Sequence, residues 1–296
     1  MKKVMYPLAS LALIAFLVSC NSNDTSKDVS LPAKILIQNE GVHIDYTDSG
    51  NGDTTLLFVH GWCINKTYWS DQVSFFSKKY RVITIDLPGF GASGKNRASW
   101  NTQTFGRDID SVIYVLNLKN VILIGHSMAG DIILEAAVKS TDNVIGLVGV
   151  DNFKNTGQVQ TKEDKENYKK AIDSLKINFK ATASDYFNQA LFYKTTADSI
   201  KKRILGEVSV CDSVIAVACI AQDDFDEVKK LVAVKKKLSL INSDYTPTDT
   251  SSFVANHIPY ELFLIHNTGH FPMVEKPVAF DSLLQIAITR INIDGK

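Results

Sequence analysis

The sequence lacks an excess of charge of either sign. Its 32 Lys and Arg residues balance 32 Asp and Glu residues, and it has no block of basic residues large enough to follow a phosphate backbone, which excludes nucleic acid as the expected partner. Cysteine is also scarce, with only 4 residues. No two of them show the C-x-x-C spacing that is typical of a metal site. No phosphate loop or dinucleotide fingerprint occurs, so we expect neither a metal nor a cofactor.

Length and composition set the size of the folded part. A chain of 296 residues with 45% hydrophobic residues can bury one large core, or a core together with a small lid. The sequence contains no internal repeats. We therefore expect a globular protein whose partner is a small molecule, and the sequence carries no signal for its oligomeric state.

The N-terminus has the layout of an export signal. Lys2 and Lys3 precede an apolar run, Leu8–Val18, that is short for a membrane span. The run ends in Leu17-Val18-Ser19-Cys20, which resembles the lipobox of bacterial lipoproteins. This resemblance implies that Cys20 is lipidated and becomes the new N-terminus. The alternative is an ordinary cleaved signal with an incidental cysteine.

A tether follows the predicted signal peptide of residues 1–20. Residues 21–33 are mostly polar, rich in Asn, Ser and Asp, and have little to bury. The resemblance thus implies a domain anchored by lipid to a membrane of the bacterial cell envelope, facing the periplasm or the exterior. Without Cys20, three cysteines remain, and this odd number predicts no disulfide framework: Cys63, Cys211 and Cys219.

An apolar run that ends on a serine organises the rest of the chain. Residues Val121–Gly130 predict a strand, a tight turn at Ser127 and the start of a helix. Such a turn holds the serine hydroxyl clear of its own backbone, and only small neighbours such as Gly125 and Ala129 tolerate its strained geometry. The alternative is that Ser127 is simply an N-cap of the helix.

The turn resembles a known catalytic motif. Gly125-His126-Ser127-Met128-Ala129 is similar to the G-x-S-x-G nucleophile elbow of the α/β-hydrolase fold, with Ala129 in place of the second glycine. The resemblance implies that Ser127 is the nucleophile. It also implies that the backbone N–H of Met128 is one donor of an oxyanion hole.

Two further segments resemble the same family in the expected order. His60-Gly61-Trp62-Cys63 follows a predicted strand and is similar to the segment that supplies the second oxyanion donor, here the N–H of Trp62. Asp86–Ser93 resembles the D-x-P-G-x-G-x-S turn, and for Asp86 we expect a structural role. His60 and His126 are expected to orient loops through hydrogen bonds.

The general base is predicted near the C-terminus. Asn267–Pro277 follows a predicted strand and resembles the histidine loop of the family, with the pattern G-H-F-x-x-x-E-x-P. The resemblance implies that His270 is the base. The chain order of nucleophile, acid and histidine then agrees with the family.

Two aspartates compete for the role of the acid. Asp244 stands three residues before Pro247, after the second-last predicted strand, where the commonest family pattern has its acid. Asp151 ends the preceding strand, which is the place used by some lipases and dehalogenase-like members. We prefer Asp244 and keep Asp151 as the alternative, since fold analogy alone does not decide a site.

The alternation of predicted strands and helices indicates an α/β protein with a mostly parallel sheet and helices on both faces. The resemblance implies the α/β-hydrolase fold, with a core formed by residues 34–151 and 233–296. Residues 152–232 are charged and helix-forming with interspersed Tyr and Phe, and they fall where many family members carry a helical cap.

These observations predict a serine hydrolase that cleaves a small, mostly apolar ester, lactone or amide through an acyl-enzyme. A serine at the elbow argues against dehalogenases and epoxide hydrolases of this fold, which need a carboxylate there. Two alternatives are kept. One is a peptidase similar to proline aminopeptidases, for which Glu163–Glu166 is the candidate site for the amino terminus. The other is a non-catalytic protein that binds a small ligand.

Overall fold

The computed structural model describes residues 34–221 and 225–294. The predicted signal peptide of residues 1–20, with its lipidated Cys20, and the tether of residues 21–33 lie outside the described residues. None of the described helices is both long and apolar enough to cross a bilayer.

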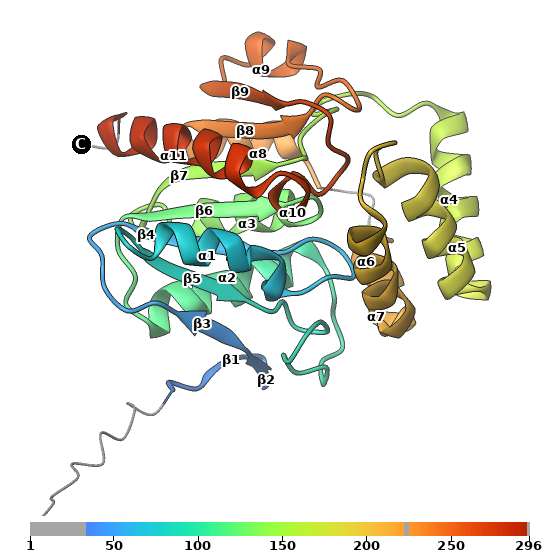
Figure 1. Ribbon diagram of the computed structural model, residues 1–296, viewed down its shortest axis with the longest axis horizontal. Coiled ribbons are helices and arrows are strands. Elements are labelled where there is room, and N and C mark those ends of the chain that lie inside the picture. The colour runs from blue at the N-terminus through green and yellow to red at the C-terminus, as the bar shows by residue number, and fades with distance from the viewer. Residues whose placement is uncertain (1–33, 222–224, 295–296) are drawn as a thin grey trace, which may run out of the picture. The chain divides into compact units, whose positions relative to one another are not determined.

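Within the described residues, seven strands form the main sheet in the order β3-β5-β4-β6-β7-β8-β9 (Figure 1). β3 runs antiparallel to β5, and all other neighbouring strands are parallel. This confirms the predicted mostly parallel sheet. The strands are β3 (Tyr46–Asp48), β4 (Thr55–Val59), β5 (Arg81–Ile85), β6 (Val121–His126), β7 (Val144–Val150), β8 (Leu238–Ser243) and β9 (Tyr260–Ile265).

The N-terminal strands form a separate two-stranded hairpin. β1 (Ile37–Asn39) pairs antiparallel with β2 (Val42–Ile44), with Glu40 and Gly41 both at positive φ, 51° and 76°, as the tight turn between them requires. The chain leaves this hairpin at Asp45, whose N–H donates to Oγ of Ser93, and the next residues join the main sheet as β3.

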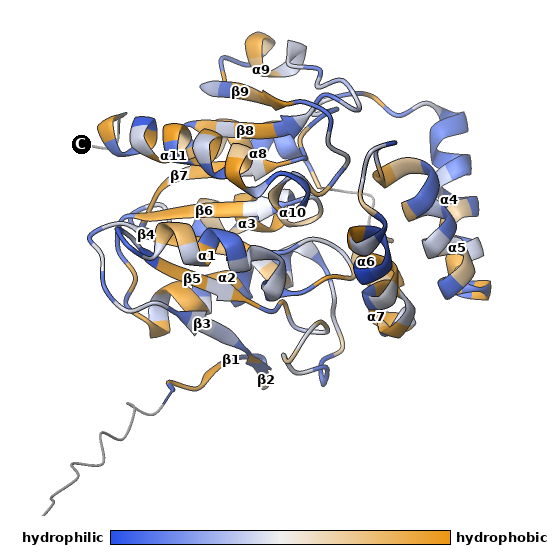
Figure 2. Cartoon of the chain, viewed as in Figure 1, coloured by the Kyte–Doolittle hydropathy of each residue, from blue (hydrophilic) through white to orange (hydrophobic). Residues whose placement is uncertain are grey.

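Helices cover both faces of the sheet, and this explains why β4 and β6 are buried at every position. α1 (Ser70–Phe76) and α11 (Pro277–Asp294) lie on one face, and α2 (Thr102–Val115), α3 (Ala129–Lys139) and α8 (Glu227–Val234) lie on the other (Figure 1). Figure 2 shows β6 hydrophobic along most of its length. Short helical turns complete the core: η1 (Lys66–Trp69), α9 (Ser251–Ala255) and α10 (Pro272–Glu275).

A helical segment is inserted between β7 and β8. It contains α4 (Lys162–Ile177), α5 (Phe179–Tyr186), the π-helix η2 (Phe187–Leu191), α6 (Asp198–Val210) and α7 (Ser213–Ile220). These elements, which we call the cap, lie beside the carboxyl ends of the strands (Figure 1). Thr161 and Asp164 form a capping box that begins α4. α8 starts within the range predicted for the cap, yet it packs against α3.

Candidate active site

Ser127 lies in a sharp turn between β6 and α3. Its φ of 53° is in the left-handed region, which is costly for a residue with a side chain. The turn closes only because its neighbours are small. A Cβ added to Gly125 would lie 2.5 Å from the carbonyl oxygen of Ala129, and one added to Gly61 would lie 3.1 Å from Cβ of Ser127. Asn152 supports the turn, because its Nδ2 donates to the carbonyl oxygen of Gly125 at 2.9 Å.

Three side chains from different loops form a hydrogen-bonded line. Oγ of Ser127 lies 2.7 Å from Nε2 of His270, and Nδ1 of His270 lies 2.6 Å from Oδ2 of Asp151. The ionised carboxylate only accepts, so Nδ1 carries the ring proton and Nε2 is left to accept from the serine hydroxyl. This is the geometry that acyl transfer requires of a nucleophile, a base and an orienting acid.

The preference for Asp244 as the partner of His270 was wrong. Asp244 lies after β8 and is hydrogen-bonded to Nδ1 of His266 at 2.7 Å, with 41% of its side chain exposed. Asp151, the alternative, is the carboxylate that contacts His270. Its φ of 49° turns the chain sharply after β7 and directs the side chain toward the histidine loop.

Asp151 is almost fully buried, and its carboxylate is surrounded by hydrogen-bond donors and an ammonium group. Oδ1 accepts from the N–H of Ser243 at 2.8 Å and from its hydroxyl at 2.7 Å, and it lies 2.8 Å from Nζ of Lys154. Burial alone would raise the pKa of Asp151. The hydrogen bond and electrostatic interaction with His270, together with the ammonium of Lys154, outweigh burial and hold this pKa well below its usual range.

The two predicted oxyanion donors lie in the wall of the cavity that contains Ser127 and His270. Among the described residues, the backbone N–H groups of Trp62 and Met128 have no hydrogen-bond acceptor. Such unpaired N–H groups are rare in folded proteins, and they are what an oxyanion hole offers. The indole N–H of Trp62 donates to the carbonyl oxygen of Ala216 in α7 at 2.8 Å, so the cap holds this residue in place.

His60 and His126 join loops, as expected. Nδ1 of His60 donates to the carbonyl oxygen of Gly61 at 2.8 Å, and its Nε2 accepts from the N–H of Leu87 at 2.9 Å. Nε2 of His126 donates to the carbonyl oxygen of His270 at 2.7 Å. Burial, followed by the neighbouring His270, lowers the pKa of His126 to about 3, so this ring is neutral and stays a donor to the histidine loop.

The cap is fastened to the histidine loop. The N–H of His270 donates to the carbonyl oxygen of Leu191 at 2.8 Å. On the other side, Oε1 of Glu275 accepts from the N–H of Gly269 at 3.0 Å, and its Oε2 accepts from the hydroxyl of Thr196 in the cap at 2.7 Å. The position of His270 is therefore tied to the position of cap residues 191–196.

The cavity above Ser127 has a volume of about 510 Å³ and lies between the core and the cap. Its wall is mainly apolar, with Ile172 and Leu175 from α4 and Phe187 from η2. The acidic residue in this wall is Asp131, which is hydrogen-bonded to Glu227. Burial first, and then the neighbouring carboxylate, raises the pKa of Asp131.

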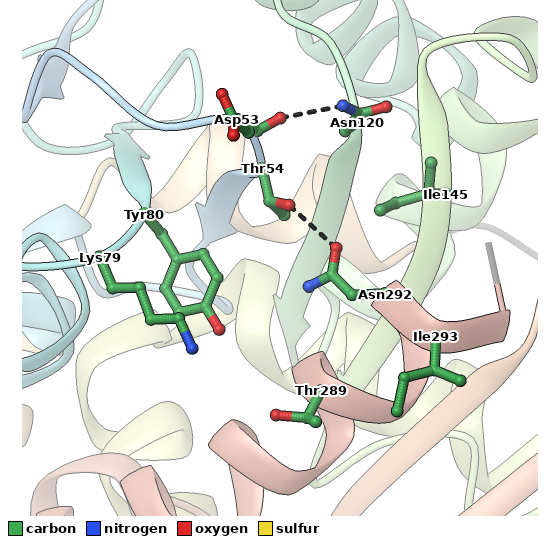
Figure 3. A pocket seen from close by; sticks show the side chains of 9 residues that line it. All are labelled: Asp53, Thr54, Lys79, Tyr80, Asn120, Ile145, Thr289, Asn292 and Ile293. Atoms are coloured by element: carbon green, nitrogen blue, oxygen red, sulfur yellow. Dashed lines mark hydrogen bonds between the residues drawn. The ribbon is translucent and has the colours of Figure 1, made fainter. Parts of the chain in front are cut away.

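A second cavity, of about 860 Å³, opens at the amino ends of the strands (Figure 3). Its polar residues bond to one another: Nδ2 of Asn120 donates to the carbonyl oxygen of Asp53, and Oγ1 of Thr54 donates to Oδ1 of Asn292, each at 2.9 Å. Neither Ser127 nor His270 lines it. The hydroxyl, the imidazole and the unpaired N–H groups all lie at the opposite end of the sheet.

Five side chains with roles in this geometry were missed from the sequence: Asn152, Lys154, Ser243, Glu275 and Thr196. Lys154 stands three residues after Asp151, a spacing that could have drawn attention to it. Glu275 belongs to the histidine-loop pattern, whereas Thr196 lies between η2 and α6 of the cap and has no sequence signal.

Fold and family comparisons agree with this architecture. Residues 54–198 match the family described as the alpha/beta hydrolase fold. The chain has the α/β-hydrolase fold, as predicted.

Three similar proteins illustrate the relationship. The AB hydrolase superfamily protein YisY of Bacillus subtilis is 26% identical over 256 residues, which cover 83% of this chain and 95% of that protein. A putative non-heme chloroperoxidase of Synechocystis is 38% identical over 88 residues, 29% of this chain and 32% of the chloroperoxidase. An esterase of Thermogutta terrifontis has a TM-score of 0.74 at 20% identity, covering 87% of this chain and 98% of the esterase, which is a likeness of fold.

Proposed function

We propose that this protein is a serine hydrolase that cleaves a small, mostly apolar ester, lactone or amide through an acyl-enzyme intermediate. The observation that carries the proposal is the hydrogen-bonded line from Ser127 through His270 to Asp151, with distances of 2.7 Å and 2.6 Å. The apolar cavity beside this line supports a substrate with little charge.

In the first half of the reaction, Nε2 of His270 takes the hydroxyl proton as Oγ of Ser127 attacks the substrate carbonyl. The N–H groups of Trp62 and Met128 stabilise the oxyanion that forms. Asp151 keeps the ring in the required tautomer and stabilises the imidazolium. His270 then protonates the leaving alcohol or amine, and the acyl group remains on Ser127.

In the second half, His270 removes a proton from water, which attacks the acyl-enzyme, and His270 then returns this proton to Oγ of Ser127 as the carboxylic acid is released. Because the nucleophile is a hydroxyl, the intermediate is an acyl ester. The aromatic and aliphatic cap residues exclude bulk water from the first step.

The test is covalent labelling combined with turnover. A fluorophosphonate probe is expected to label the protein at Ser127 and to leave the S127A variant unlabelled. Hydrolysis of p-nitrophenyl esters of increasing acyl length should proceed in the wild type, with preference for short chains. The absence of both labelling and turnover would contradict the proposal. Saturable binding of an ester that stays intact would favour the ligand-binding alternative. Anilides of amino acids with a free amino group test the peptidase alternative in the same assay.

We also propose that the protein is a lipoprotein anchored to a membrane of the bacterial cell envelope. The resemblance of Leu17–Cys20 to a lipobox supports this location. Growth with an alkyne-bearing fatty acid should label the wild type and bring it into the membrane fraction. The C20A variant should lose the label, and an equally labelled C20A protein would contradict the proposal.

A further inference from the structure

Lys154 contacts the candidate acid on the side away from the base. Its Nζ lies 2.8 Å from Oδ1 of Asp151, while His270 bonds to Oδ2 of the same carboxylate. Only 13% of the Lys154 side chain and 4% of the Asp151 side chain are exposed. Water and salt therefore screen this pair weakly, and a unit charge at this distance has a substantial effect.

The loop after β8 holds the ammonium in place. Nζ of Lys154 donates to Oγ1 of Thr246 at 2.7 Å and lies 3.2 Å from the carbonyl oxygen of Ser243. The hydroxyl of Ser243 donates to Asp151 and can accept from Lys154. Lys154 is thus fixed by several acceptors, and its charge cannot swing away from the carboxylate without breaking them.

The other titratable groups around the line do not replace this charge. Burial, followed by His270, lowers the pKa of His126, which keeps that ring neutral, and burial, followed by Asp151, raises the pKa of Tyr186. Asp244 contacts His266 at the surface instead. Among the described residues, Lys154 is the one lysine or arginine that forms an ion pair with Asp151.

We propose that Lys154 is a positioning residue that aims Asp151 at His270 and limits how strongly this carboxylate stabilises the imidazolium, so that the enzyme keeps its base unprotonated and works at lower pH. The inference rests on the proposed serine-hydrolase function. Its physical basis is that the ammonium neutralises part of the carboxylate charge and repels a proton on the imidazole.

The experiment compares variants of the full chain. In K154M, the acidic limb of kcat/KM against pH should move to higher pH by about one unit, because the opposing charge is gone. KM should stay within about twofold, since Lys154 does not line the cavity. K154Q, which removes the charge and keeps a polar tip, should move the limb in the same direction.

The matched control is K237M. Lys237 also forms a partly buried ion pair, with Glu261 at 2.6 Å, but it stands just before β8, at the other end of that strand. The K237M profile should coincide with that of the wild type. A lysine that only supports the fold would lower activity equally at all pH values, so a shift of the limb separates positioning from general support.

An activity-independent measurement keeps the test separate from the proposed function. NMR of the ring protons of His270, assigned with H270N, gives the pH at which the ring titrates, and K154M should raise it. If the wild type has no turnover, the proposed function fails while this titration still tests Lys154. The inference would be overturned if K154M and K154Q fold but leave both the acidic limb of kcat/KM and the titration of His270 unchanged. It would also be overturned if both variants fail to fold, because Lys154 would then be a structural residue.

Discussion

The hydroxyl of Thr196 and the carboxylate of Glu275 lie 2.7 Å apart and join the cap to the loop that carries His270. The second oxygen of Glu275 accepts from the N–H of Gly269, next to the base. One carboxylate therefore holds the backbone of the histidine loop and a side chain of the cap at the same time.

Breaking this link should displace His270. We expect E275A to lower kcat roughly 10- to 100-fold, because hydrogen bonds to a charged acceptor contribute about 1.5–3 kcal/mol. T196V removes only the cap bond and should cost less. Steady-state kinetics of both variants and of the double variant check the link. The double variant should be no less active than E275A alone, because E275A already removes the hydrogen bond to Thr196. A double variant whose loss of activity equals the combined losses of E275A and T196V would contradict the link.

The candidate acid can be identified by a pair of isosteric substitutions. D151N should lower kcat on the order of ten-thousandfold, because the amide no longer selects the productive tautomer of His270 or stabilises the imidazolium. D244N should stay within a few-fold of the wild type, as Asp244 contacts His266 at the surface. Turnover of a p-nitrophenyl ester measures both, and a reversed order would refute the assignment of Asp151.

The close approach at the nucleophile turn predicts opposite effects for two glycines. A Cβ on Gly61 would lie 2.6 Å from Nδ1 of buried His126, so G61A should destabilise the fold by about 1–3 kcal/mol and lower activity. A Cβ on Gly206, in α6, meets nothing within 4 Å. G206A should therefore gain up to about 1 kcal/mol from helix propensity. Denaturant unfolding measures the free energy of unfolding of both variants. Equal values for G61A and G206A would show that the space around Gly61 can accept a Cβ.

Asp151 should also make stability depend on pH. Its folded pKa lies below the unfolded value, so its contribution is present above about pH 4 and is lost as the pH falls toward the folded pKa. The difference in free energy of unfolding between wild type and D151N should shrink by about 1 kcal/mol from pH 6 to pH 3. The S127A variant removes no charge and should follow the wild-type slope. A difference independent of pH would show that Asp151 is not ionised in the folded state.

Local sequence predicted the parts of the site that local geometry determines. Ser127 stands at a strand end with Gly125 and Ala129 two positions away on either side, and His270 belongs to a pattern that follows a strand, so both positions could be predicted from neighbouring residues. The same holds for Trp62 and Met128, whose main-chain N–H groups depend on the turns that carry them.

The acid could not be chosen from the sequence. Asp151 and Asp244 follow β7 and β8, which are parallel neighbours, so both carboxylates arrive at the same edge of the sheet. The choice depends on the left-handed turn at Asp151 and on the presence of His266 beside Asp244. The links from Leu191 and Thr196 to the histidine loop were equally hidden, because they join segments far apart in the chain.

The contact between Asp151 and Ser243 has a consequence for how such a site can change. Ser243 ends β8, and its N–H and hydroxyl touch the carboxylate that β7 supplies. The two strand ends are one hydrogen bond apart, so a carboxylate on either would face the same imidazole. The ends of β7 and β8 thus offer two adjacent positions for one carboxylate. Exchanging Asp151 and Ser243 would transfer the negative charge from β7 to β8, while Ser127 and His270 stay in place.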